Sequence, residues 1–335
     1  MIKNKKFEVV SLFSGCGGLD LGLHGGFKFL GKKYKANPFR VIYANDVNKA
    51  ATDTFKLNFP DVPQVENEDL TIVLEDGVSI PKRADLVIGG FPCQDFSLAG
   101  KRQGLNVKRG QLYLSMVETV KRVMPQVFLA ENVKGLLLWE KGLAIETIRS
   151  DFAELGYNVT YKLLNTADYG VPETRERVII VGVRQDIKKE FEFPEPTHAK
   201  APTGRQKHWV TLRNAIGDLE DQTKHDLMPN SGFSKAKLFA GTQGNRTCAA
   251  DKPGPTMRAE HHGNIEFHYL GHRRLSAREA ARIQSFPDDF IFQKSTTDAY
   301  RQIGNAVAPV FGWHLAQALL EVLSFSNGDL SRPPR

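Results

Sequence analysis

The sequence predicts an α/β protein with a doubly wound, mostly parallel sheet and a second, smaller domain of irregular structure. Short apolar runs alternate with helical patterns from Phe7 to Gly182, and this alternation is typical of parallel strands connected by helices. The periodicity is lost from Asp186, and regular patterns resume only at Ser276. A chain of 335 residues is long enough for about two domains.

The individual elements follow from apolar runs, helical periodicity and capping residues. We expect strands at 7–13, 39–44, 84–89, 127–130, 159–164 and 177–182, with a further short strand at 69–73. We expect helices at 49–58, 112–124, 141–155, 276–284 and 309–323. Ser276 and Glu279 have the spacing of a capping box that begins a helix, and Pro287 ends it.

Composition and charge limit the class of protein. Lys and Arg number 45 against 38 Asp and Glu, and the resulting charge of +7 permits a nucleic-acid partner without requiring one. Three cysteines, Cys16, Cys93 and Cys248, do not make a disulfide framework, which favours a reducing, cytoplasmic location. We expect no apolar run of membrane-spanning length and no secretory signal.

A glycine-rich loop follows the first predicted strand. In Phe13-Ser-Gly-Cys-Gly-Gly-Leu-Asp20 the glycines let the backbone turn tightly and approach a ligand. Asp20 stands where a dinucleotide-binding loop has its third glycine, and a carboxylate there disfavours a pyrophosphate but suits an ammonium group. Asp46 follows the next strand, where such folds bind a ribose hydroxyl. These residues indicate an adenosine that carries an amino acid, although a turn that only packs a helix on the sheet is an equal alternative.

Reactive side chains follow later strands, at the edge where open α/β sheets bind ligands. Cys93 lies in the loop after Gly89, where a thiol of lowered pKa would add to an electron-poor carbon. Arg175 and Arg177 are candidate cations for lowering that pKa. Glu131 either caps the following helix or is a buried acid that shares a proton. A lone cysteine is more often a small buried hydrophobe, so none of these residues decides the function alone.

Seven motifs occur in a fixed order along the chain. They are Phe13-Ser-Gly-x-Gly-Gly-Leu-Asp20, Gly90-Phe-Pro-Cys-Gln-x-Phe-Ser97, Arg109-Gly-Gln-Leu-Tyr113, Glu131-Asn-Val133, Tyr169-Gly-Val-Pro-x-x-Arg-x-Arg177, Arg274-Leu-Ser-x-Arg-Glu-x-Ala-Arg-x-Gln-x-Phe-Pro287 and Gln302-Ile-Gly-Asn-Ala-Val307. The series resembles the bacterial DNA (cytosine-5-)-methyltransferases of restriction-modification systems. The resemblance covers roughly 7–184 and 273–323 and leaves out the middle of the chain.

The resemblance implies the S-adenosylmethionine-dependent methyltransferase fold and a division of the chain into three parts. Residues 1–187 plus 299–335 would form a discontinuous catalytic and cofactor-binding domain. Residues 188–272 would form the target-recognition domain. The stretch 186–272 is nearly neutral, with 12 Lys and Arg against 11 Asp and Glu. Residues 273–298 would form the hinge between them.

The resemblance implies four catalytic residues. Cys93 would attack carbon 6 of a flipped-out cytosine, so that carbon 5 becomes nucleophilic enough to take a methyl group. Glu131 would hold the N3 edge of the base, Arg177 would contact the pyrimidine, and Arg175 would lie near the thiolate. No residue is identified as the base that removes the carbon-5 proton. Glu173 departs from the family, which usually has Gln at this position, and would weaken the local positive field.

The resemblance implies S-adenosyl-L-methionine as the cofactor and no metal. The residues that would bind the cofactor are Phe13, Gly15, Gly17, Leu19, Asp46, Val47, Asp69, Leu70, Pro92, Asn305 and Val307. Asp46 stands where Glu is common in the family, which would shorten the contact to the ribose.

The implied partner is double-stranded DNA, bound by a monomer, with no membrane involved. A cognate restriction endonuclease of the same system would act without direct contact. The DNA-binding residues would be Gln94, Ser97, Lys101, Arg102 and Arg109 in a loop closing on DNA, and Arg246, Arg258 and His261 in the target-recognition domain.

Other functions remain as alternatives. An RNA cytosine methyltransferase of the same fold would keep much of the motif series, and a catalytically silent DNA-binding relative would keep the fold. Intact Cys93, Glu131, Arg175 and Arg177 argue against the silent relative. Asp20 in the glycine loop argues against a nicotinamide-dependent oxidoreductase.

Overall fold

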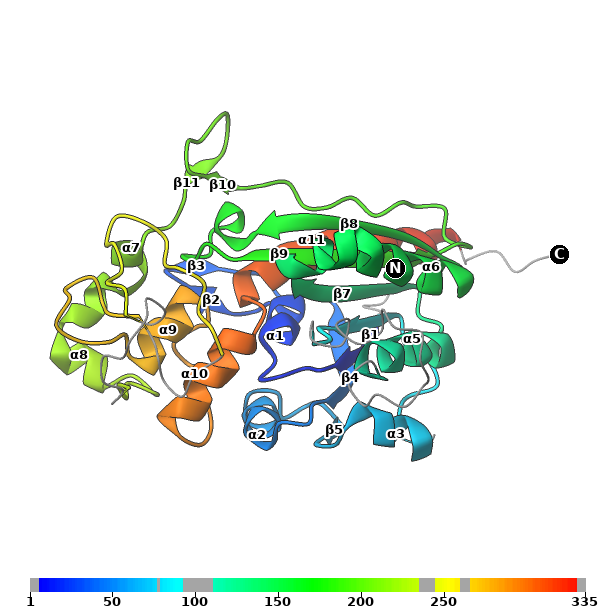
Figure 1. Cartoon of the computed structure of the whole chain (residues 1–335), viewed down its shortest axis with the longest axis horizontal. Helices are drawn as coiled ribbons and strands as arrows, with labels where there is room; N and C mark the ends of the chain where they lie inside the picture. The colour runs from blue at the N-terminus through cyan, green and yellow to red at the C-terminus, as the bar shows by residue number, and fades with distance from the viewer. Residues whose placement is uncertain (1–5, 77–78, 93–110, 235–244, 260–265, 330–335) are drawn as a thin grey trace.

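A seven-stranded sheet forms the centre of the protein (Figure 1). The computed structural model describes residues 6–76, 79–92, 111–234, 245–259 and 266–329. The strands lie in the order β5 (Val65–Glu66), β4 (Phe39–Asn45), β1 (Phe7–Leu12), β6 (Leu86–Gly89), β7 (Val127–Val133), β9 (Glu176–Arg184) and β8 (Tyr157–Asn165). Neighbours from β5 to β7 are parallel, while β9 is antiparallel to β7 and β8. The predicted doubly wound, mostly parallel sheet is confirmed.

Helices cover both faces of this sheet. One face carries α1 (Gly18–His24) and α11 (Pro309–Asp329), and the other carries α3 (Leu70–Asp76), α5 (Gln111–Val123) and α6 (Leu143–Glu154). Strand β7 shows how the sequence builds these layers. Val127 and Leu129 belong to the apolar core shared with α11, while Phe128 and Ala130 belong to the core shared with α5 and α6, because side chains alternate between the faces of a strand.

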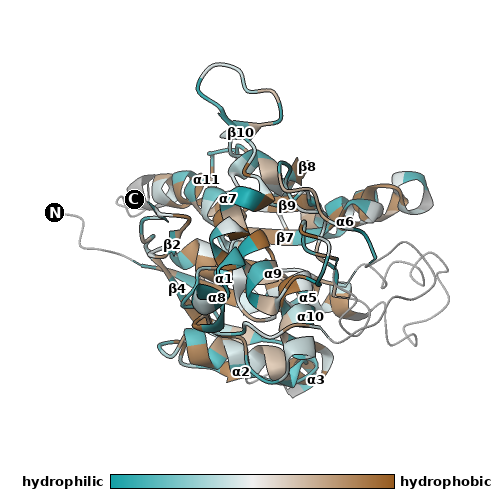
Figure 2. Cartoon of the chain, turned by 90° about the vertical axis from the view of Figure 1, so that its left-hand side faces the viewer, coloured by the Kyte–Doolittle hydropathy of each residue, from teal (hydrophilic) through white to brown (hydrophobic). Residues whose placement is uncertain are grey.

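The remaining elements are short. They are α2 (Lys49–Asn58), α7 (Leu212–Ile216), α8 (Gln222–Asp226), α9 (Ala277–Ile283), α10 (Thr296–Asn305), the pairs β2 (Lys28–Phe29) with β3 (Lys32–Lys33) and β10 (His198–Ala199) with β11 (Lys207–His208), and the 3-10 turns η2 (Lys134–Leu137), η3 (Trp139–Gly142), η4 (Thr166–Tyr169) and η5 (Gly217–Glu220). A separate apolar core joins α7, α9 and α10, on the side of the molecule that faces the viewer in Figure 2. The predicted boundary at residue 299 falls within α10, so one helix spans the border between the expected hinge and the expected catalytic domain.

The strand expected at 69–73 is wrong, because these residues begin helix α3. The Asp69 carboxylate accepts hydrogen bonds from the Thr71 amide at 2.9 Å and from the Thr71 hydroxyl at 2.8 Å, as a residue before a helix does. The short strand lies earlier, at β5. The capping box at Ser276 and Glu279 is present as predicted and begins α9.

One helical stretch is longer and more apolar than we expected from the sequence, which predicted no apolar run of membrane-spanning length. Residues Thr296–Ser326 are long and apolar enough to cross a membrane by length and composition, and 72% of the apolar window is buried inside the protein. Its C-terminal part, α11, packs along α1 and supplies Phe311, Leu315 and Leu319 to the core. Burial in a protein core therefore accounts for its apolar character.

Candidate active site

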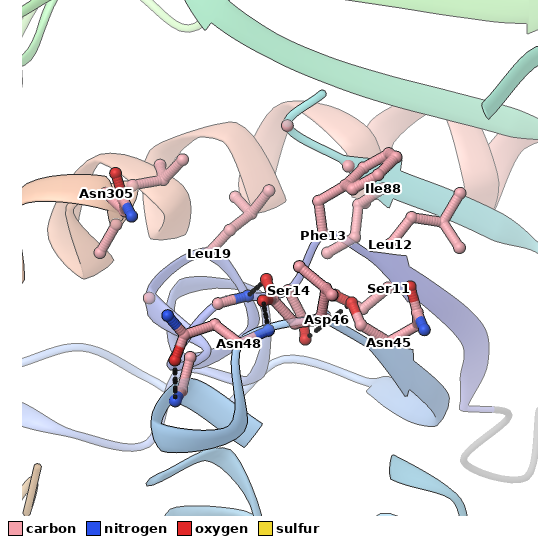
Figure 3. Close-up of a pocket in the computed structure, with 18 of the residues that line it drawn as sticks. Ser11, Leu12, Phe13, Ser14, Leu19, Asn45, Asp46, Asn48, Ile88 and Asn305 are labelled. Carbon is pink, nitrogen blue, oxygen red and sulfur yellow. Dashed lines mark hydrogen bonds between the residues drawn. The ribbon is translucent and has the colours of Figure 1, made fainter. Parts of the chain in front are cut away.

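A cavity of about 410 Å³ lies at the carboxyl ends of β1, β4 and β6 and is closed on one side by the end of α10 (Figure 3). Parallel strands leave their ligand site at this edge because the following loops diverge there. Ten of the eleven predicted cofactor residues line the cavity. They are Phe13, Gly15, Leu19, Asp46, Val47, Asp69, Leu70, Pro92, Asn305 and Val307.

The glycine loop meets the cavity at Gly15. Gly15 has a φ of +56°, and a Cβ built on it would meet no atom of the described residues within 4 Å, so the backbone is exposed to whatever occupies the cavity. Gly17 also has a positive φ, of +90°, but a Cβ there would collide with the ring of Phe59. Gly17 does not line the cavity. Its contribution is to let the loop pack on Phe59, which differs from the predicted ligand contact.

The cavity wall is acidic. Among the residues that the structure describes, its lining includes five carboxylates, Asp20, Asp46, Glu68, Asp69 and Glu131, against a single Lys or Arg, namely Arg301. Arg301 itself lies 3.7 Å from a carboxylate oxygen of Asp298. Such a wall attracts a cationic ligand and repels a phosphate.

Asp46 holds the glycine loop and the start of α2 in place. One of its carboxylate oxygens accepts the Gly15 amide and the other accepts the Asn48 amide, both at 2.8 Å (Figure 3). Burial raises the pKa of this carboxyl group. Each carboxylate oxygen can accept more than one hydrogen bond, so these two contacts leave room for a ligand hydroxyl.

Glu131 and Arg177 form an ion pair at the cavity. The Arg177 Nε atom lies 2.7 Å from Glu131 Oε1, and both side chains are largely buried. The strand register explains the pair, because Glu131 lies opposite Ile179 and Arg177 lies opposite Val133, which makes them diagonal neighbours on one face. Strand β7 is longer than predicted, because it continues past Ala130 and includes Glu131.

The other oxygen of Glu131 faces the loop that leads to Cys93. A Cβ built on Gly90 would lie 3.2 Å from Glu131 Oε2, so glycine at this position permits the close approach. Phe91 and Pro92 follow, and Asn132 donates a hydrogen bond of 2.9 Å to the Phe91 carbonyl. Cys93 itself lies outside the described residues, as do Gln94, Ser97, Lys101, Arg102, Arg109 and His261.

Arg175 is engaged by backbone carbonyls. It is 3% exposed, and its two terminal nitrogens donate to the Met257 carbonyl at 2.8 Å and the Gly304 carbonyl at 2.7 Å. Burial and the neighbouring Arg177 lower the pKa of Arg175 to about 10. The guanidinium thus ties the loop before β9 to segment 257–259 and to the end of α10, a role that the sequence did not predict.

The fully buried Glu173 belongs to the same cluster. Its carboxylate accepts the Met257 amide and lies 3.9 Å from the Arg175 guanidinium. Burial raises the pKa of Glu173, which Arg175 partly offsets. Glu173 therefore faces Arg175 and segment 257–259, where it partly neutralises the guanidinium.

Residues 7–321 match the family model of the C-5 cytosine-specific DNA methylases. The chain belongs to this family. Type II methyltransferase M.NgoFVII of Neisseria gonorrhoeae is 37% identical over 344 residues, which cover 96% of this chain and 88% of the relative. Type II methyltransferase M.BsuRI of Bacillus subtilis is 37% identical over 350 residues, which cover 91% and 77%.

Solved structures share the fold of this methylase. A prophage-encoded DNA modification methyltransferase of E. coli matches with a TM-score of 0.70 at 22% identity, covering 95% of this chain and all of that one. The Dnmt2 methyltransferase of S. pombe matches with a TM-score of 0.63 at 18% identity, covering 95% and 99%. The S-adenosylmethionine-dependent methyltransferase fold is thereby confirmed.

The cavity of this methylase fits the cofactor class of its family. S-adenosylmethionine carries a sulfonium and an ammonium cation and no phosphate, which suits the acidic wall. Several residues of that wall were not predicted, including Ser11, Asn45, Asn48 and Ile88. Their positions at or beside the carboxyl ends of β1, β4 and β6 were the available signal, since that edge of the sheet was already expected to bind the ligand.

Two predicted DNA contacts lie on the methylase surface. Arg246 and Arg258 are exposed, and neither forms an ion pair within the described ranges of the chain. The backbone of Arg258 packs directly on Gly304, where a Cβ would collide with it. Arg258 therefore lies close to Asn305 of the cavity wall.

Proposed function

We propose that this protein transfers a methyl group from S-adenosylmethionine to carbon 5 of a flipped-out cytosine in a specific duplex DNA sequence. We further propose that it acts as a cytoplasmic monomer and as the modification enzyme of a type II restriction-modification system. A cognate nuclease would cut the same sequence without contacting this protein. The names of the type II relatives and the family membership support this proposal.

One observation carries the proposal. The Glu131–Arg177 pair and the loop entering Cys93 meet the wall of the same cavity that ten predicted cofactor residues line. A methyl donor and a pyrimidine bound at these two places would be adjacent, which a direct transfer requires.

The cofactor would occupy the cavity by its nucleoside and amino-acid parts. Asp46 would hold the ribose, Asp69 and Leu70 the adenine, and Gly15 would let the backbone approach the amino-acid part. When bound, the cofactor supplies an electrophilic methyl group. Phe13, Leu19, Pro92 and Val307 would exclude water around it.

The chain's own residues would activate the base. The Cys93 thiolate forms a bond to carbon 6, and the electrons of the 5,6 double bond become available at carbon 5. Glu131 would hold N3 and supply a proton as negative charge builds on the ring, with Arg177 orienting both the carboxylate and the pyrimidine. After methyl transfer the carbon-5 proton goes to water or another base, the double bond re-forms, and Cys93 leaves.

Transfer of a tritiated methyl group to duplex DNA tests the proposal. Wild type should label DNA and Cys93→Ser should not, while a duplex containing 5-fluorocytosine should trap wild type covalently. Bisulfite sequencing of DNA from expressing cells then gives the target sequence. Labelling that Cys93→Ser retains would remove Cys93 from the nucleophile role, and labelling of RNA but not DNA would favour an RNA substrate.

A further inference from the structure

Among the acidic residues of the cavity, Asp20 has a carboxylate oxygen that no group in the described part of the chain satisfies. Asp20 lies on α1, lines the cavity and is 1% exposed. The neighbouring Ser11 hydroxyl favours the ionised form of this carboxylate, but Asp20 Oδ1 has no hydrogen-bond partner among the residues that the structure describes. Burying a carboxylate without a full set of partners is costly, so its presence in a cavity wall indicates that a ligand completes the interaction.

Other carboxylates of the wall already have partners. Asp46 accepts two backbone amides, Asp69 accepts the amide and hydroxyl of Thr71, and Glu131 pairs with Arg177. The missing partner of Asp20 therefore has to be a donor, and a cationic donor would also neutralise the charge.

We propose that Asp20 is the counter-charge of the α-ammonium group of S-adenosylmethionine and thereby selects an ammonium-bearing nucleoside. This inference rests on the proposed function, because it takes the cavity to be the cofactor site. Asp20 lies on α1 and Leu70 lies on α3, and these helices cover opposite faces of the sheet. The assignment thus puts the amino acid and the adenine at different ends of the cavity.

The protonation of Asp20 gives the assignment a second readout. Burial raises the pKa of Asp20 to about 7 in the ligand-free protein. Cys16 is a titratable neighbour of Asp20 and also interacts with Asp46, while Ser11 is neutral and Arg301 is the one Lys or Arg of the described cavity wall. An ammonium group against Asp20 would favour its ionised form, so binding at pH 7 should release about half a proton.

Calorimetry with two ligands tests the assignment. We would titrate wild type, Asp20→Asn and Glu68→Gln with S-adenosylhomocysteine and with its analogue in which hydrogen replaces the α-amino group. Glu68→Gln removes a carboxylate from the same cavity at an exposed position, so it controls for charge alone. Wild type should bind the deaminated ligand at least about 30-fold more weakly, since truncating one partner of a buried charged pair typically costs this much or more.

The outcomes separate the two proposals. Asp20→Asn should bind both ligands with similar affinity, and Glu68→Gln should keep the wild-type preference. Repeating the titration in two buffers of different ionisation enthalpy should show proton release for wild type and Glu68→Gln but not for Asp20→Asn. A wild-type preference that Asp20→Asn retains, or no proton release from wild type, would overturn the role of Asp20 alone. Failure of wild type to bind either ligand would overturn the cofactor site itself.

Discussion

Replacing Asp20 with Asn should change how the stability of the ligand-free protein depends on pH. The pKa of Asp20 is raised from 3.8 to about 7 by burial, so the folded protein holds a proton that the unfolded chain releases above about pH 4. A group whose pKa is raised by folding contributes stability below the unfolded pKa, and this stability is lost as pH rises through the folded pKa. The side-chain amide of the Asp20→Asn variant would not titrate.

The magnitude follows from the size of the shift. One pKa unit corresponds to about 1.4 kcal/mol, so the two units between pH 5 and pH 7 contribute about 3 kcal/mol. Between pH 5 and pH 8, wild type should lose about 3 kcal/mol more unfolding free energy than Asp20→Asn. All other ionisable groups are common to both proteins and cancel in the difference.

Urea denaturation at pH 5, 6, 7 and 8 measures this difference. The stability advantage of Asp20→Asn should grow with pH up to about 7 and then level off. Parallel pH profiles for the two proteins would refute the reasoning, since they would mean that Asp20 ionises as readily in the cavity as in water. Saturating S-adenosylhomocysteine should reduce the advantage of the variant, because a bound ammonium group would stabilise the ionised carboxylate.

Four further variants test the site. Arg175→Met leaves the carbonyls of Met257 and Gly304 and the Glu173 carboxylate without their cation. Urea denaturation should show a loss of about 3–5 kcal/mol of unfolding free energy. An unchanged urea midpoint with lost methyl transfer would instead indicate a catalytic role. Glu131→Gln should slow methyl transfer about 100-fold or more while calorimetric affinity for S-adenosylhomocysteine stays nearly constant, and full transfer by this variant would exclude the proposed proton donor. Gly15→Ala should lose about 1–2 kcal/mol of unfolding free energy because of its positive φ. Gly17→Ala should lose more, because its Cβ would also collide with Phe59. Equal losses of thermal stability in the two variants would contradict the packing role of Gly17.

Much of the fold was predictable because it depends on local patterns. Apolar runs and helical spacing determined most of the sheet and the covering helices, and the helix at 49–58 matches α2 residue for residue. The pattern failed at 69–73, where a stretch of five residues is too short to distinguish a strand from a helix. There the Asp69 carboxylate decides, since it binds the Thr71 amide and hydroxyl at the start of α3.

Most of the cavity was also predictable, because the carboxyl ends of parallel strands meet at one edge of the sheet. Strand ends and motif order therefore predicted cavity residues from both ends of the chain, from Phe13 to Val307. Gly17 was predicted to contact the cofactor like its neighbours, but it packs on Phe59. Whether Gly17 faces the cavity or Phe59 depends on how α2 packs against the glycine loop, and no local sequence pattern shows this.

The sequence alone determined the layered fold, the family and the position of the site, because these follow from periodicity and from motifs in a fixed order. Only the tertiary structure decided what the charged residues do. Arg175 binds carbonyls of segment 257–259 and α10, which are distant in sequence, while Asp20 has a buried oxygen without a partner in the described ranges of the chain. Burial and partners determine the state of a charge, and both arise only when remote segments pack together.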